Sequence, residues 1–108
     1  MNFVKIVSII RPEALEKVEM ALKSMNVPGV SITNIQGYGE YANFFRHDRM
    51  VQHIQVEIFI GKRQATEIAE KIMEVAHSGI EGDGIVAIIP VESVYHIRTR
   101  QKCGDEVC

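Results

Sequence analysis

Apolar and β-branched residues gather in four short runs that predict β-strands. Residues 3–10 (FVKIVSII) are almost continuously apolar, which is typical of a strand in the centre of a sheet. Residues 30–36 (VSITNIQ) and 85–89 (IVAII) form two further runs. Residues 53–60 alternate strictly. Their apolar members are Ile54, Val56, Ile58 and Ile60, and their polar members are His53, Gln55 and Glu57.

Two other stretches repeat apolar residues at helical spacing. The first begins at Pro12, whose ring suits the first turn of a helix, and ends at residues 26–29 (NVPG). Its apolar face consists of Leu15, Val18, Leu22 and Met25. The second covers residues 64–78, and we expect Gly79 to end it. Its apolar face consists of Ala65, Ile68, Ala69, Ile72, Val75 and Ala76.

The order of these elements is β-α-β-β-α-β, which predicts an α+β, ferredoxin-like fold: an antiparallel sheet with two helices on one face. We expect one domain over residues 1–97, with a protruding loop at 40–52, and a C-terminal arm at 98–108. After Pro90 the chain is expected to continue as a short fifth strand or an edge arm. The second face of the sheet would be exposed in a monomer, and oligomerisation is the simplest way to bury it.

Composition excludes several classes of protein. Hydrophobic residues make up 46% of the 108 residues and charged residues 24%, which is ordinary for a folded globular chain. A net charge of −2 provides no basic field, so we expect no nucleic-acid partner. The apolar start contains Lys5 and is too short to span a bilayer. We therefore expect a cytoplasmic protein.

Two sequence elements suit the binding of phosphate. Gly82, Asp83 and Gly84 could place backbone N–H groups around an anion, although a plain helix-to-strand turn is the competing interpretation. Arg98 and Arg100 lie two apart and would point the same way if the chain were extended there, which would form a forked pair of cations. A solvated run of charges is the alternative for this second element.

The long segment after the second strand has the features of a functional loop. It opens on Gly37, Tyr38 and Gly39, which could let the loop fold over a ligand or could be a simple turn. Its middle carries aromatic and basic side chains suited to contact a partner protein or to fold back onto the body. These candidate partner-binding residues are Tyr41, Phe44, Phe45, Arg46 and Arg49.

No catalytic or metal constellation stands out. The histidines at positions 47, 53, 77 and 96 are scattered, and we expect polar surface or helix-end roles for them. The two cysteines supply only half of a zinc shell, so no tightly bound metal is expected. We predict that the protein is not an enzyme. Slow nucleotide hydrolysis stays open and would need carboxylates such as Asp83 and Glu40.

Three quoted stretches, SIIRPEALEKVEMAL, VPGVSITNIQGYG and HSGIEGDGIVAIIPVESVYHIRTR, together resemble the PII signal-transduction superfamily over nearly the whole chain. The resemblance implies a ferredoxin-like homotrimer that binds adenine nucleotides (AMP, ADP or ATP) in clefts between subunits. It also implies that the loop after the second strand, residues 40–52 here, reports the bound state to a partner protein.

The resemblance carries over to individual residues. Gly37, Tyr38 and Gly39 match the family's G-F-G, and Ser31 matches a threonine near the adenine. The phosphate loop corresponds to residues 82–84. His96 and Arg98 fall on the two arginines of the family's R-x-R, and Arg100 lies just beyond them. The implied nucleotide-binding residues are Ser31, Gly37, Tyr38, Gly39, Gly82, Asp83, Gly84, Arg98 and Arg100.

Departures from the family pattern bear on the ligand. Ile85 stands where a phosphate-binding lysine usually follows G-D-G, and His53 replaces another lysine. Glu40 and Tyr41 replace the basic and glutamine residues after G-F-G. We therefore favour a PII-like regulator of a membrane transporter or metabolic protein, recruited to the membrane by that partner. The alternatives are a classical nitrogen-regulatory PII protein that binds ATP and 2-oxoglutarate, and a metal-binding trimer of the same fold.

The tail KCGDEVC holds both cysteines, Cys103 and Cys108. A C-x4-C pair can close a small disulfide ring, which would be labile in the cytoplasm, and two free thiols are the alternative. The tail is similar to the redox-sensitive C-terminal loop of PII-like regulators of bicarbonate transport. That similarity implies a redox role for the two cysteines.

Overall fold

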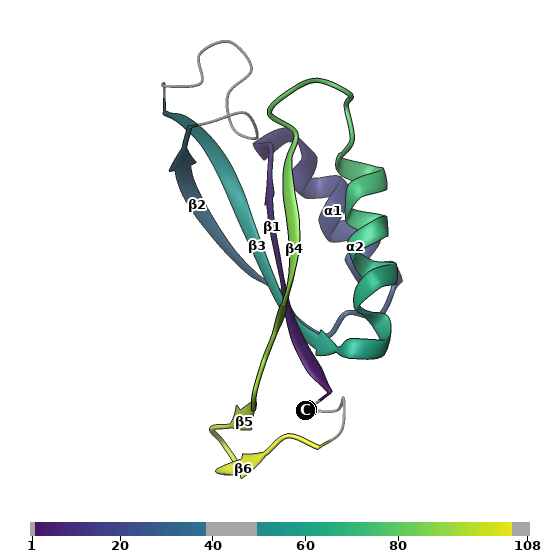
Figure 1. Cartoon of the computed structure of the whole chain (residues 1–108), viewed down its shortest axis with the longest axis vertical. Coiled ribbons are helices and arrows are strands. Elements are labelled where there is room, and N and C mark those ends of the chain that lie inside the picture. Colours follow the sequence, from purple (N-terminus) through teal and green to yellow (C-terminus); the bar gives the residue numbers. More distant parts are fainter. Residues whose placement is uncertain (1, 39–49, 105–108) are drawn as a thin grey trace.

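The structure is a computed structural model that describes residues 2–38 and 50–104. Four strands form one sheet in the order β2-β3-β1-β4, with every neighbouring pair antiparallel. Their bounds are β1 Phe3–Ile10, β2 Ser31–Gly37, β3 Val51–Gly61 and β4 Gly84–Pro90. Two helices, α1 (Leu15–Ser24) and α2 (Lys62–Ala76), lie on one face of this sheet (Figure 1). The predicted ferredoxin-like fold is confirmed.

Alternation along the central strands separates the two faces of the sheet. In β1, and in β3 from Ile54 to Ile60, the even-numbered residues point toward the helices and are buried. The core contains Val4, Ile6, Ile10, Val18, Leu22, Ile54, Val56, Ile58, Ile60, Ile68 and Ile72. Burial of so much aliphatic surface is the main favourable term in folding, at about 25 cal/mol per Å². The apolar periodicity of the sequence therefore identifies the core.

The helices begin and end close to the predicted positions. Pro12 opens a short 3-10 turn, η1 (Pro12–Ala14), which leads directly into α1. Helix α2 ends earlier than expected, at Ala76, because His77 already has an extended backbone with ψ 126°. Gly79, which was predicted to stop the helix, instead lies in the following loop with φ +90°. That prediction was wrong.

The chain after β4 forms a small hairpin apart from the main sheet. Strands β5 (Tyr95–His96) and β6 (Gln101–Lys102) pair antiparallel. The hairpin joins residues on both sides of the expected arm boundary at residue 98. It lies at one end of the elongated molecule, whose extents are 47 × 25 × 20 Å, and the loop between α2 and β4 lies at the other end (Figure 1).

The described residues leave the second face of the sheet exposed, and its side chains on β1 and β4 are largely apolar. Residues opposite one another in neighbouring strands share a face, so Phe59, Lys5 and Ile89 lie in one row and Ile9 and Ile85 in another. Phe59 is 51% exposed, Ile85 46% and Ile89 41%. We call the uncovered surface of these strands the open face, and its apolar members are Val7, Ile9, Phe59, Ile85, Ala87 and Ile89.

Within the described ranges, neither helix is long and apolar enough to cross a bilayer.

Candidate functional site

The loop between α2 and β4, residues 77–83, and the first residue of β4 depend on glycine at three positions. Gly79, Gly82 and Gly84 have φ values of +90°, +95° and +110°, which side chains rarely tolerate. Gly84 also pairs with Ile10 of β1, and a Cβ built on Gly84 would lie 1.7 Å from the carbonyl oxygen of Ile9. Residue 84 must therefore be glycine for β4 to pair with β1.

The Asp83 carboxylate holds this loop together. Oδ2 accepts hydrogen bonds from the backbone N–H groups of Ser78 (2.8 Å) and Gly79 (3.0 Å). Oδ1 accepts from the Ser78 hydroxyl and from Arg11 Nε (3.0 Å). Arg11 also donates from Nη2 to the carbonyl oxygen of Glu81 at 2.6 Å. The end of β1 and the loop after α2 are thus joined through one carboxylate.

These contacts fix the charge of Asp83. Partial burial by itself raises the pKa of Asp83, but the hydrogen bonds from Ser78, Arg11 and Gly79 outweigh it and hold that pKa well below its ordinary value. Both carboxylate oxygens are occupied by donors of the chain itself. Asp83 therefore organises the loop, which argues against the catalytic, metal-positioning role considered for it.

His53 of β3 forms a hydrogen bond with the same loop. Its side chain is buried, with 3% of the residue exposed, and Nε2 lies 3.0 Å from the carbonyl oxygen of Gly82. We had expected His53 to lie on a polar surface. That expectation was wrong, because β3 extends beyond the end of β1 and brings the imidazole under the loop.

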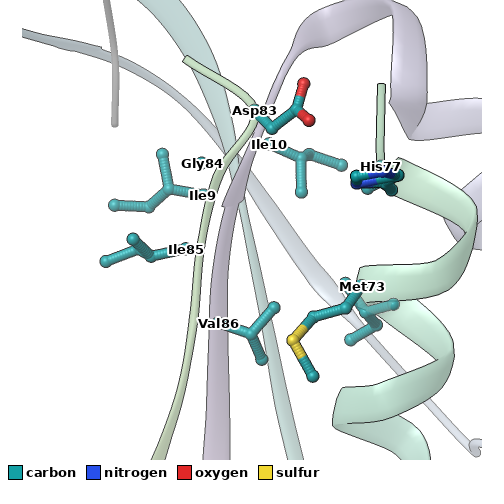
Figure 2. Close-up of a pocket in the computed structure, with 10 residues that line it drawn as sticks. Ile9, Ile10, Met73, His77, Asp83, Gly84, Ile85 and Val86 are labelled. Carbon is teal, nitrogen blue, oxygen red and sulfur yellow. The ribbon is translucent and has the colours of Figure 1, made fainter. Parts of the chain in front are cut away.

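A cleft of about 230 Å³ lies beside the loop, between β1, β4 and α2. Figure 2 shows Met73 of α2 facing Val86 of β4 across it, with His77, which follows α2, and Asp83 and Gly84 toward its upper rim. Among its described lining residues, His77 and Asp83 are the only ionisable ones. Ile85 occupies the position where a lysine would supply a cation. The described lining of this cleft therefore offers phosphate no lysine or arginine.

The other predicted binding residues lie in two separate places. Ser31 and Gly37 are the first and last residues of β2, at the opposite edge of the sheet from β4, and Tyr38 follows them and is 61% exposed. Gly37 pairs with Val51 at the start of β3. His53 of that same strand contacts Gly82, so Gly37 and Tyr38 lie toward the same end of the sheet as the phosphate loop.

Arg98 and Arg100 lie in the turn between β5 and β6. The N–H of Arg100 donates to the carbonyl oxygen of His96 at 2.8 Å, and Arg100 itself has φ +58°. The chain is therefore not extended here, and the prediction of a forked pair on an extended strand was wrong. A second cleft, of about 250 Å³, is lined by His96, Arg98, Thr99, Gln101, Lys102, Cys103 and Gly104.

Comparison with known proteins identifies the chain. A family model described as "Nitrogen regulatory protein P-II" matches residues 3–101. The chain belongs to the P-II family. Among P-II proteins, that of Cyanidium caldarium is 31% identical over 112 residues, with 97% of this chain and 99% of the relative covered. That of Nostoc punctiforme is 32% identical over 110 residues, covering 95% and 98%.

A solved P-II structure has the same fold. The crystal structure of Arabidopsis thaliana PII bound to citrate matches with a TM-score of 0.82 and 30% identity, covering 97% of this chain and 92% of that one. The predicted PII membership is confirmed. The names of the relatives favour the nitrogen-regulatory alternative over regulation of a transporter, and none of them points to bicarbonate transport.

Several predicted P-II site residues lie outside the described ranges. They are Gly39, Tyr41, Phe44, Phe45, Arg46, Arg49 and Cys108, together with Glu40. The protruding loop was expected to reach residue 52, but β3 already begins at Val51. Cys103 is 8% exposed and disulfide-bonded, and its N–H donates to the carbonyl oxygen of Val94 at 2.8 Å.

The contacts that Arg11, Ser78 and His53 make with this loop could not be predicted from the sequence. Arg11 stands between the first strand and Pro12, and no local pattern links it to a carboxylate 72 positions away. Ser78 gave no signal beyond its place after a helix. Within the described residues, no group of three histidine, cysteine or carboxylate side chains is arranged to hold a metal ion.

Proposed function

We propose that this P-II family member is a homotrimeric signalling protein that binds an adenine nucleotide between subunits. One observation carries the proposal. The cleft beside Gly82–Gly84 has no lysine or arginine among its described lining residues, while Arg98 and Arg100 lie at the opposite end of the same 47 Å molecule. A nucleotide that touches both elements must therefore lie between two copies of the chain.

The open face supplies the contact surface for such an assembly. Its apolar residues adjoin one another across β1 and β4, with Phe59 nearby on β3, and monomeric proteins seldom leave a large patch of this kind in water. Lys5 lies between Phe59 and Ile89 and forms a 3.8 Å ion pair with Glu57, and Gln55 donates to Glu57 at 2.8 Å. This polar row favours one alignment of neighbouring sheets over others.

Phe59→Glu is expected to convert the oligomer to monomer, because it places a charge on the open face at its most exposed aromatic residue. Sedimentation velocity measures the change. Met20→Glu is the matched control, since Met20 is 65% exposed on α1, away from the open face, and should leave the oligomer intact. An unchanged sedimentation coefficient for Phe59→Glu would show that this face does not hold the subunits together.

Nucleotide binding is expected to depend on Arg98 in the C-terminal arm. We expect AMP and ADP to bind as well as ATP, because Ile85 replaces the lysine that would favour a triphosphate. Arg98→Ala should weaken calorimetric binding of all three by about tenfold to a hundredfold, the range for a lost charge-assisted hydrogen bond. Lys23→Ala, on the last turn of α1, is the control and should bind normally. Absence of binding by the unaltered protein would remove the proposal.

We propose that the bound state is reported to a partner protein through residues 40–52, as a shift between loop states. The names of the relatives support nitrogen signalling as the pathway. A membrane transporter or metabolic protein is the second candidate, supported by the changes at Ile85 and His53. Adding 2-oxoglutarate to the ATP titration separates them: tighter ATP binding supports nitrogen signalling, and no effect supports the second candidate.

Two further expectations accompany this function. We expect the protein to act in the cytoplasm, reaching the membrane only with its partner. The C-terminal cysteines are proposed as a redox pair, supported by the disulfide-bonded state of Cys103 and its place beside Arg98 in the arm cleft. Oxidation would then change nucleotide binding more than stability, because a short ring removes little chain entropy.

A further inference from the structure

His53 has one polar contact within the described residues, and that contact is with the phosphate loop. The carbonyl oxygen of Gly82 is an acceptor, so Nε2 of His53 donates the 3.0 Å hydrogen bond. Nδ1 is buried and has no hydrogen-bond partner among the described residues. A buried imidazole with a single bond of this kind holds a specific group in place and contributes little else.

The held carbonyl determines where the next N–H points. In a trans peptide the C=O and the following N–H point in opposite directions. Because the Gly82 carbonyl points inward to His53, the N–H of Asp83 points outward from β3. Gly82 has φ +95°, a conformation in which the peptide can turn easily if nothing holds it. Without His53, the carbonyl oxygen could point outward instead and would repel an anion.

We propose that His53 is a positioning residue of the phosphate loop, fixing the Gly82–Asp83 peptide so that its N–H is available to a nucleotide phosphate. This inference rests on the proposed nucleotide function. His53 lies in β3 two residues after its start, and β3 directly follows the protruding loop in sequence. The same hydrogen bond therefore connects the phosphate loop to the strand that carries the protruding loop.

Two substitutions test the role. His53→Leu replaces the imidazole, and with it the Nε2–H donor, by an apolar side chain of similar size. His53→Gln places an amide N–H near the position of Nε2. We expect His53→Leu to weaken ADP binding about tenfold, the effect of one lost hydrogen bond, and to change adenosine binding less than twofold. His53→Gln should restore most of the ADP affinity. If His53 only stabilised the fold, His53→Leu would weaken the binding of ADP and of adenosine equally, and His53→Gln would not restore ADP binding.

Amide NMR of the unliganded protein provides a second measurement. The N–H signal of Asp83 should shift and exchange faster in His53→Leu and return toward its original state in His53→Gln. If the unaltered protein binds no ADP, the proposed function fails, and this NMR result still decides the role of His53. An Asp83 signal that is the same in all three proteins, or equal losses of ADP and adenosine binding, would overturn the inference.

Discussion

Gly84→Ala is expected to prevent the protein from folding. The added Cβ would lie 1.7 Å from the carbonyl oxygen of Ile9 and 2.7 Å from its carbonyl carbon, and these are backbone atoms that cannot turn aside. The φ of +110° adds strain of its own. Relief requires β4 to separate from β1, which would expose the core strand. We expect the free energy of unfolding to fall by more than about 4 kcal/mol, which is among the largest effects of single substitutions.

Gly29→Ala is the matched control, because nothing lies within 4 Å of a Cβ built at that position. Soluble yield and urea unfolding measure both variants. Gly29→Ala should unfold close to the original midpoint, whereas Gly84→Ala should be insoluble or unfolded in buffer. A folded Gly84→Ala protein with an ordinary midpoint would mean that β4 does not pair with β1 in the register found here.

Asp83→Asn is expected to lower the free energy of unfolding by about 2–3 kcal/mol at pH 7, because hydrogen bonds to a charged group are lost. The asparagine also places an NH2 group among the donors of Ser78, Gly79 and Arg11. The folded pKa of Asp83 lies below its unfolded value, so the carboxylate stabilises the fold above the ordinary pKa of aspartate, near 3.9. That contribution disappears as the pH falls through the folded pKa.

Urea unfolding at pH 7 and in acid measures this effect. The difference between Asp83→Asn and the original protein should be largest at neutral pH and should shrink as the pH is lowered below the unfolded pKa. Glu74→Gln is the control, since Glu74 forms a surface pair with Lys71 at 3.6 Å and its side chain is 70% exposed. A stability loss that is the same at every pH would assign the effect to packing and not to charge.

The fold follows from patterns that are local in the sequence. Helical spacing and strict alternation report which face of each element is buried, and they predicted Val18 and Leu22 of α1 and the four core isoleucine and valine residues of β3, although not the buried Ala21. The end of α2 could not. A glycine is a common stop, but here the backbone becomes extended at His77, two residues earlier, because the Asp83 carboxylate binds the N–H groups of residues 78 and 79.

The site depends on contacts between distant residues, which no local pattern reports. The glycines at 82 and 84 indicated a loop of unusual backbone conformation, and the structure contains one. Arg11 and Asp83 are 72 positions apart, and His53 and Gly82 are 29 apart. Alternation separated His53 from the core residues of β3, but no local pattern shows that the loop at Gly82 buries it. The arm was predicted wrongly as extended, because two arginines spaced two positions apart do not indicate the tight turn that the chain makes at Arg100.

Hydrogen exchange with and without ADP tests the central claim most directly. One nucleotide is too short to reach from the Gly82–Gly84 loop to the hairpin around Arg98 in the same chain. A site between subunits predicts that ADP protects segments 78–86 and 94–102 together, at the same midpoint concentration, and that Arg98→Ala weakens protection of both. Protection of only one segment, or of 78–86 at an unchanged midpoint in Arg98→Ala, would contradict the account.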